Sequence, residues 1–149
     1  MKNMFTTITA VVLLLISFNA SAVDPIYTPF LSNKAIRGYD TVAYFTEGKP
    51  VKGNKAHSTE YKGATWQFAS KNNLDLFVAN PEKYAPQYGG YCAYAVSQNT
   101  TASIEPEQFT VLDGKLYLNY NKKVNELWNT DREGFIAAAN KNWPGILAK

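Results

Sequence analysis

Sulfur and imidazole are the scarcest chemical groups in this sequence. Its 149 residues contain one cysteine, Cys92, one histidine, His57, and two methionines. One cysteine cannot form an intramolecular disulfide. Nor can one thiol and one imidazole complete a closed metal site of soft ligands within a single chain. Metal or nucleophile chemistry would therefore have to combine these two side chains with carboxylates or tyrosines.

Clustered charge of one sign is also missing. The 15 Lys and Arg residues and 12 Asp and Glu residues give a formal net charge of +3, and the longest basic run is Lys122-Lys123. Proteins that bind nucleic acids concentrate lysine and arginine in a stripe or patch. The sequence therefore predicts no nucleic-acid partner.

The chain has no apolar run long enough to span a bilayer, which needs roughly 20 residues. Its most apolar segment, Val11–Ile16, lies between a positive Lys2 and the small residues Ala20-Ser21-Ala22. This order is typical of a secretory signal peptide, here residues 1–22. We therefore expect cleavage before Val23, a periplasmic or secreted protein, and no membrane span after cleavage.

Removing residues 1–22 from the 149 leaves 127 residues, enough for one domain but not for two. Residues 23–34 contain two prolines and are predicted to be irregular. Residues 35–149 are predicted to form the domain. The sequence shows no internal repeats and no low-complexity tracts.

Turn dipeptides between strand-forming residues predict two β-hairpins. The first lies within Ser58–Ser70 and turns at Lys62-Gly63. The second joins Phe109–Leu112 to Lys115–Leu118 through Asp113-Gly114, a dipeptide that suits a type I′ turn.

Capping residues predict two of the helices. Ser70 precedes an apolar stripe at helical spacing, formed by Leu74, Phe77 and Val78. The capping box Thr130–Glu133 opens a second helix, predicted to end near Asn142 before Pro144.

Three shorter segments complete the expected elements. A helix is expected around Lys122–Trp128, and Val42–Phe45 and Cys92–Val96 fit either a short helix or a buried strand. The predicted fold is one small α+β domain with two β-hairpins and three or four short helices.

Several segments together resemble a YHS domain. They are Gly38–Phe45, His57-Ser58, Tyr61–Phe68 and Asn80–Tyr84. Two later segments, Tyr88–Tyr94 and Asp113–Tyr120, are similar to the exported branch of bacterial YHS-domain proteins. The resemblance extends over about residues 35–146.

The resemblance implies a small metal-handling module, of the kind found beside copper and heavy-metal transporters and attached to some oxygenases. Metal-linked members carry cysteines just after the aromatic strand, where this chain has Phe68-Ala69-Ser70. The motif that names the family is also incomplete, because Ala56 stands in place of the tyrosine.

One hypothesis is a copper or zinc site formed by His57, Cys92 and Asp40. Thiolate and imidazole suit both metals, and the carboxylate adds an oxygen ligand. Such a site needs an open position, further oxygen ligands or a second chain. The alternative is that Cys92 is a small buried side chain and that His57 lies on a solvated loop. A free thiol also leaves open a disulfide between two chains.

The same three residues also fit a Cys/His-dependent enzyme. Cys92 would be the nucleophile, His57 the base and Asp40 the residue that orients the base. Backbone N–H groups at Gly89-Gly90 could then face an oxyanion. Any chain with one cysteine, one histidine and a dozen carboxylates permits this interpretation.

A third hypothesis is a cleft for a small ligand, lined by Tyr39, Tyr44, Tyr91 and Tyr94. The alternative is that these aromatic rings fill the core, as in a structural or interaction protein with no small-molecule site. Taken together, the sequence favours a non-enzymatic binding module for a metal ion or a small ligand. It leaves the oligomeric state open.

Overall fold

The structure is a computed structural model that describes residues 22–149, so the predicted signal peptide lies almost wholly outside the described residues. The strands are β1 (Asn54–Tyr61), β2 (Ala64–Phe68), β3 (Phe109–Leu112) and β4 (Lys115–Leu118). The α-helices are α1 (Ala43–Thr46), α2 (Lys71–Ala79), α3 (Pro81–Tyr84), α4 (Ala93–Ser97), α5 (Lys122–Asn129) and α6 (Arg132–Leu147). Two short 3-10 segments are η1 (Ala35–Gly38) and η2 (Gln87–Gly90).

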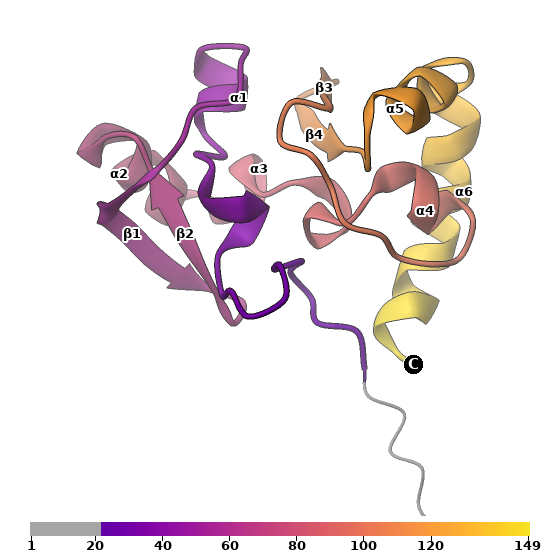
Figure 1. Cartoon of the computed structure of the whole chain (residues 1–149), viewed down its shortest axis with the longest axis horizontal. Coiled ribbons are helices and arrows are strands. Elements are labelled where there is room, and N and C mark those ends of the chain that lie inside the picture. Colours follow the sequence, from indigo (N-terminus) through magenta and orange to yellow (C-terminus); the bar gives the residue numbers. More distant parts are fainter. Residues whose placement is uncertain (1–21) are drawn as a thin grey trace, which may run out of the picture.

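This architecture confirms the predicted α+β class and both hairpins. It contains more helices than the three or four expected, because Val42–Phe45 and Cys92–Val96 are largely helical and η1, η2 and α3 are added. Figure 1 shows η1 to α3 on one side of the molecule and α4 to α6 on the other. In the described part of the chain, no helix is both long and apolar enough to cross a membrane.

Both hairpins are antiparallel and turn where the sequence predicts. Lys62 and Gly63 have φ of 49° and 80°, and Asp113 and Gly114 have φ of 51° and 73°. Positive φ at both central residues is the signature of a type I′ turn. Pairing of β1 with β2 is regular from Ser58 to the turn and irregular before it.

Helix α2 begins as predicted, because the hydroxyl of Ser70 accepts a 3.1 Å hydrogen bond from the Asn73 amide. The predicted apolar stripe is wrong at Val78, which is 58% exposed. The stripe is confirmed at Phe77, which is buried, and at Leu74, which packs half-buried against the first cluster, and Asn73 is the other buried residue of this helix. Val78 lies about 100° around the helix from Phe77, so both cannot face the core fully.

Helix α6 differs from its prediction at both ends. Its cap is Asp131, which accepts a 3.0 Å hydrogen bond from the Gly134 amide. The helix continues through Pro144 to Leu147 rather than ending near 142. Ile146 is only 2% exposed, and we attribute the extension to this burial, which offsets the hydrogen bond that proline removes.

The core is divided into two clusters of buried side chains. The first includes Trp66, Phe68 and Phe77, and the second includes Tyr117 and Trp128. Strand β4 belongs to both, because successive side chains on a strand point to opposite faces. Leu116 and Leu118 belong to the first cluster and Tyr117 to the second.

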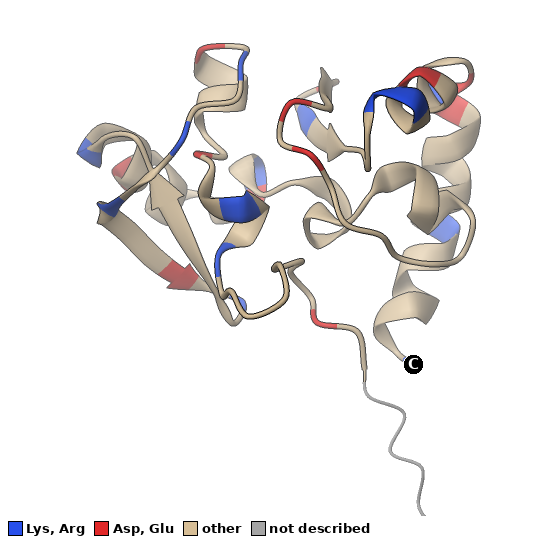
Figure 2. Cartoon of the chain, viewed as in Figure 1, with Lys and Arg blue, Asp and Glu red and all other residues tan. Residues whose placement is uncertain are grey.

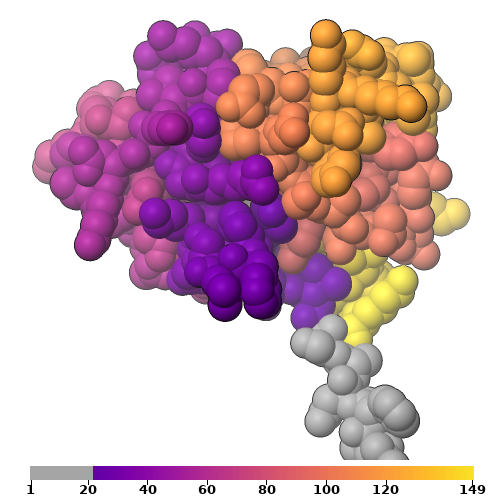
Figure 3. Space-filling model, in the orientation of Figure 1, coloured from indigo at the N-terminus to yellow at the C-terminus, as the bar shows by residue number. Residues whose placement is uncertain are grey.

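Helix α4 also lies between the two clusters. Cys92 and Ala95 belong to the first cluster, whereas Ala93 and Val96 belong to the second. Figure 3 shows the first described residues, in indigo, beside the yellow C-terminal end of the chain. In Figure 2 the acidic and basic residues are interspersed over the elements.

Candidate functional site

Two left-handed turns precede the candidate residues Asp40 and Cys92 in the sequence. Ile36–Gly38 and Tyr88–Gly90 each have three consecutive residues with positive φ. In each turn the next tyrosine amide, from Tyr39 or Tyr91, donates a 3.0 Å hydrogen bond to the first carbonyl. The sequence shows no repeat, yet this local backbone motif occurs twice.

Positive φ is unusual for a β-branched residue such as Ile36, whose φ is 49°. Its side chain is buried in the first cluster, and this burial favours the strained conformation. The residues that follow the two motifs at equal spacing are Asp40 and Cys92. The motif therefore places both candidate ligands just before helices, in different surroundings.

Asp40 is completely buried and its carboxylate is fully engaged by the protein. One oxygen accepts hydrogen bonds from the Val42 and Ala43 amides at 2.9 and 3.2 Å. The other accepts from the Ala69 amide at 2.8 Å and the Asn73 side chain at 2.7 Å. These contacts fix α1 to the end of β2 and the start of α2, which is a structural role.

Cys92 is also buried, at 1% exposure. Its thiol donates to the side-chain oxygen of Asn119 at 3.5 Å. Burial raises the pKa of the thiol, although hydrogen bonds from nearby backbone amides oppose that effect. An activated nucleophile has a lowered pKa and is accessible, so these properties describe a packed thiol. The same burial closes it to a disulfide with a second chain.

His57 is half-buried on β1, in the stretch where pairing with β2 is irregular. It therefore lies on a strand and not on the loop considered from the sequence. Among residues 22–149, no group of three or more His, Cys, Asp and Glu side chains is placed to hold a metal ion. The structure thus does not bring His57, Cys92 and Asp40 together as one site.

The four candidate tyrosines separate into two pairs. Tyr44 is buried, and its hydroxyl donates a 2.8 Å hydrogen bond to the Pro106 carbonyl. Tyr39 lies nearby, with its hydroxyl 3.5 Å from the Glu107 carboxylate. Both rings therefore pack against the segment that leads into β3.

Tyr91 and Tyr94 pack against α6 instead. The ring centroids of Tyr91 and Trp143 lie 5.9 Å apart, and those of Tyr94 and Phe135 lie 5.2 Å apart. None of the four tyrosines lines the pocket of about 480 Å³ between the two sides of the molecule, so the structure favours the core-packing alternative for them.

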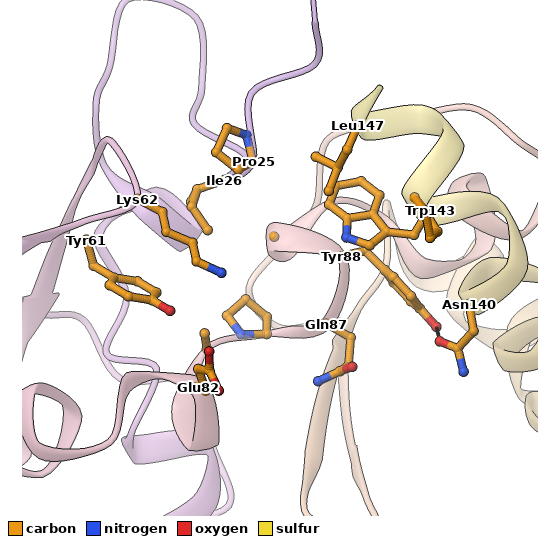
Figure 4. Close-up of a pocket in the computed structure, with 14 residues that line it drawn as sticks. Pro25, Ile26, Tyr61, Lys62, Glu82, Gln87, Tyr88, Asn140, Trp143 and Leu147 are labelled. Atoms are coloured by element: carbon orange, nitrogen blue, oxygen red, sulfur yellow. Dashed lines mark hydrogen bonds between the residues drawn. The ribbon is translucent and has the colours of Figure 1, made fainter. Parts of the chain in front are cut away.

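A pocket of about 480 Å³ lies elsewhere, between the two sides of the molecule. We call it the interlobe cleft (Figure 4). Its lining comes from the N-terminal segment, the β1–β2 turn, the α3–η2 region and α6: Pro25, Ile26, Tyr61, Lys62, Glu82, Ala85, Pro86, Gln87, Tyr88, Gly89, Asn140, Trp143, Pro144 and Leu147. Its volume falls within the range of small-molecule sites.

Gly89 positions the N-terminal segment as one wall of this cleft. A Cβ atom on Gly89 would lie 1.9 Å from the Pro25 carbonyl oxygen, closer than any side chain could approach. Nearby, the Tyr27 amide donates a 2.9 Å hydrogen bond to the Gly89 carbonyl. The glycine pair therefore serves close backbone approach, one of the roles its sequence suggests.

The cleft combines apolar walls with polar groups that are free to bind. Lys62, Glu82 and Gln87 form no side-chain hydrogen bond or ion pair with the described residues. The Asn140 side-chain oxygen accepts the Tyr88 hydroxyl at 2.9 Å, which leaves its amide N–H groups available. Such a combination suits an organic ligand better than a bare metal ion.

The sequence alone does not reveal this site, because its walls come from four separate segments. One local signal was present. A type I′ turn normally begins with Asn, Asp or Gly, and the first hairpin has Lys62 there. A residue that departs from a local preference can mark a functional position.

The YHS domain family model matches residues 42–88. The chain therefore contains a YHS domain at these residues. The match begins just before α1, covers the first hairpin with α2 and α3, and ends within η2. Cys92, the second hairpin and α6 lie beyond it. No curated protein and no solved structure matches the chain.

Proposed function

We propose that this chain is an exported, non-enzymatic binding protein whose ligand is a small organic molecule held in the interlobe cleft. The observation that carries the proposal is the cleft itself, with its volume of about 480 Å³. Aromatic and apolar side chains form its walls, and unpaired polar groups lie among them. A few polar groups in an apolar pocket are what fix the orientation of a small ligand.

The placement of the reactive residues supports a binding role over an enzymatic one. Cys92 is buried and its burial raises the thiol pKa. The Asp40 carboxylate is occupied by backbone amides and Asn73, and so it does not orient His57. Neither Cys92 nor His57 lines the interlobe cleft.

The start of the described chain supports the export part of the proposal. Ala22 is exposed, whereas Val23 packs against the second cluster. Cleavage between them would leave the folded domain intact. Intact mass of protein from the periplasm of a Gram-negative host tests this. We expect loss of residues 1–22, and an unprocessed mass would contradict export by this signal.

Ligand binding is tested with the neutral aromatic probe N-phenyl-1-naphthylamine, followed by amide shifts in nitrogen-15 NMR spectra. We expect shifts at Tyr61, Gln87 and Trp143 that saturate together. Leu147→Gln, in the cleft, should weaken binding, whereas Leu127→Gln, on the exposed face of α5, should not. Shifts scattered over the surface, or equal effects of both variants, would contradict the proposal.

A metal-binding role is the second candidate, and the family match favours it. Its test is the metal content of protein purified without chelator, with Cys92→Ala and His57→Ala alongside. Stoichiometric copper or zinc in the wild type, lost in either variant, would support this role. Substoichiometric metal, or equal content in all three proteins, would remove it.

A further inference from the structure

We infer that the ligand of the interlobe cleft is an organic anion, with its negative group at Lys62 and its apolar or aromatic body along Tyr61 and Leu147. This inference rests on the proposed function and adds the chemical class of the ligand. It comes from the polar groups that the cleft leaves unpaired.

The central observation is the ammonium group of Lys62, which is unpaired within residues 22–149. The Lys62 backbone has a φ of 49° at the first position of a type I′ turn, where Asn, Asp and Gly fit best. The second hairpin has Asp113 at the equivalent position. A lysine here sacrifices some turn stability, and in the described part of the chain its ammonium group has no ion-pair partner. Figure 4 shows that this ammonium group points into the cleft.

Tyr61 and Gln87 in the lining offer both donors and acceptors, whereas Asn140 and Trp143 add N–H donors to the cleft. The Asn140 oxygen is occupied by Tyr88, so its amide offers N–H groups. The Trp143 indole nitrogen is a donor only, and in Figure 4 it lies across the open space from Lys62. A ligand with acceptor oxygens, such as a carboxylate or a sulfonate, satisfies Lys62 together with these N–H donors.

Glu82 is the only acidic residue in the described lining. It is exposed and lies in the first turn of α3. In Figure 4 it lies on the same side of the cleft as Lys62, below the ammonium group and away from Trp143. Its carboxylate should repel a bound anion weakly, so its removal has an effect opposite to removal of Lys62.

The walls account for the apolar body of the ligand. Tyr61 lies beneath the Lys62 side chain, with the ammonium nitrogen 5.4 Å from the ring centroid. Leu147 and Trp143 face it from α6. A ligand with a flat apolar body can contact both walls while its charged group reaches Lys62.

The test compares two probes of one shape, 8-anilinonaphthalene-1-sulfonate and the neutral N-phenyl-1-naphthylamine, each titrated by fluorescence. The key variant is Lys62→Asn, which removes the ammonium group and restores the preferred turn residue. We expect its thermal midpoint to equal or exceed that of the wild type. Affinity for the sulfonate should fall about tenfold, as for a lost hydrogen bond to a charged group, and affinity for the neutral probe should change less than about twofold.

Glu82→Gln is the matched variant, because it removes a negative charge from the cleft where Lys62→Asn removes a positive one. It should tighten binding of the sulfonate about twofold, through loss of a partly screened repulsion, and leave the neutral probe unchanged. If Lys62→Asn bound each probe with the same affinity as the wild type does, the anion inference would be overturned and the proposed function would stand. Weaker sulfonate binding by Glu82→Gln would also overturn it. Failure of both probes to bind in the cleft would contradict the proposed function itself.

Discussion

The thiol of Cys92 and the side-chain oxygen of Asn119 lie 3.5 Å apart in the interior, where the first cluster meets the second. The same Asn119 oxygen accepts a 3.1 Å hydrogen bond from the Tyr94 amide. Its amide nitrogen donates to Asn125 at 3.1 Å. The only thiol of the chain is therefore part of a buried polar network that joins α4, β4 and α5.

This network predicts that the Cys92 thiol reacts slowly with thiol reagents. In the native protein at pH 8, Cys92 should react with 5,5′-dithiobis(2-nitrobenzoate) at least about 100-fold more slowly than in urea, because reaction requires an opening of the structure. The control is the same reagent with free cysteine in each buffer. Rapid stoichiometric labelling of the native protein would instead restore the nucleophile hypothesis.

Alkaline pH should destabilise the protein through its buried tyrosines. Burial, together with a smaller contribution from Tyr117, raises the pKa of Tyr88. Because the folded-state pKa is above the unfolded value of about 10, the stability contribution is fully present below pH 10 and is lost as pH rises further. We expect the urea midpoint to fall as pH rises above about 10, and to fall less steeply in Tyr88→Phe. A parallel dependence in both proteins would contradict this assignment.

Asp40→Asn should lower the free energy of unfolding by about 3 kcal/mol. The new amide group would face backbone donors and leave buried hydrogen bonds unmade. Asp113→Asn is the matched control, because Asp113 is exposed in a turn that accepts asparagine, and it should change stability by less than about 0.5 kcal/mol. Urea denaturation measures both, and similar values would show that the Asp40 network contributes little.

Comparing Gly89→Ala with Gly48→Ala should separate the cost of lost close packing from the cost of backbone strain. Gly48 also has a positive φ, but a Cβ there would meet nothing within 4 Å, so Gly48→Ala should cost about 1 kcal/mol. Gly89→Ala should cost about 2 kcal/mol more, since the N-terminal segment must move. Hydrogen exchange of the Tyr27 amide should accelerate only in Gly89→Ala. Equal costs for the two variants would contradict the close approach.

Local signals carried most of what could be predicted about the fold. The two turns and the Ser70 cap depend on neighbouring residues, and all lie where expected. The end of α6 depends on burial of Ile146 by distant elements, which no local rule contains. The prediction that Val78 is buried was wrong for the same reason, because the apolar stripe alone does not fix how far the helix is rotated against the core.

The site was harder to predict than the fold. Asp40, His57 and Cys92 were selected for their chemical type, and the structure assigns Asp40 and Cys92 to packed networks. The cleft draws on residues from Pro25 to Leu147, which meet only through the tertiary fold. The position of Lys62 in its turn was the one sequence signal for it.

Tryptophan fluorescence in the presence of N-phenyl-1-naphthylamine shows whether a small aromatic molecule binds in the interlobe cleft. Trp143 lines the cleft, whereas Trp66 and Trp128 are buried in the two clusters. We expect saturable quenching that is largely lost in Trp143→Phe and retained in Trp128→Phe. Absence of saturable quenching, or equal quenching in the two variants, would contradict a ligand site in the interlobe cleft.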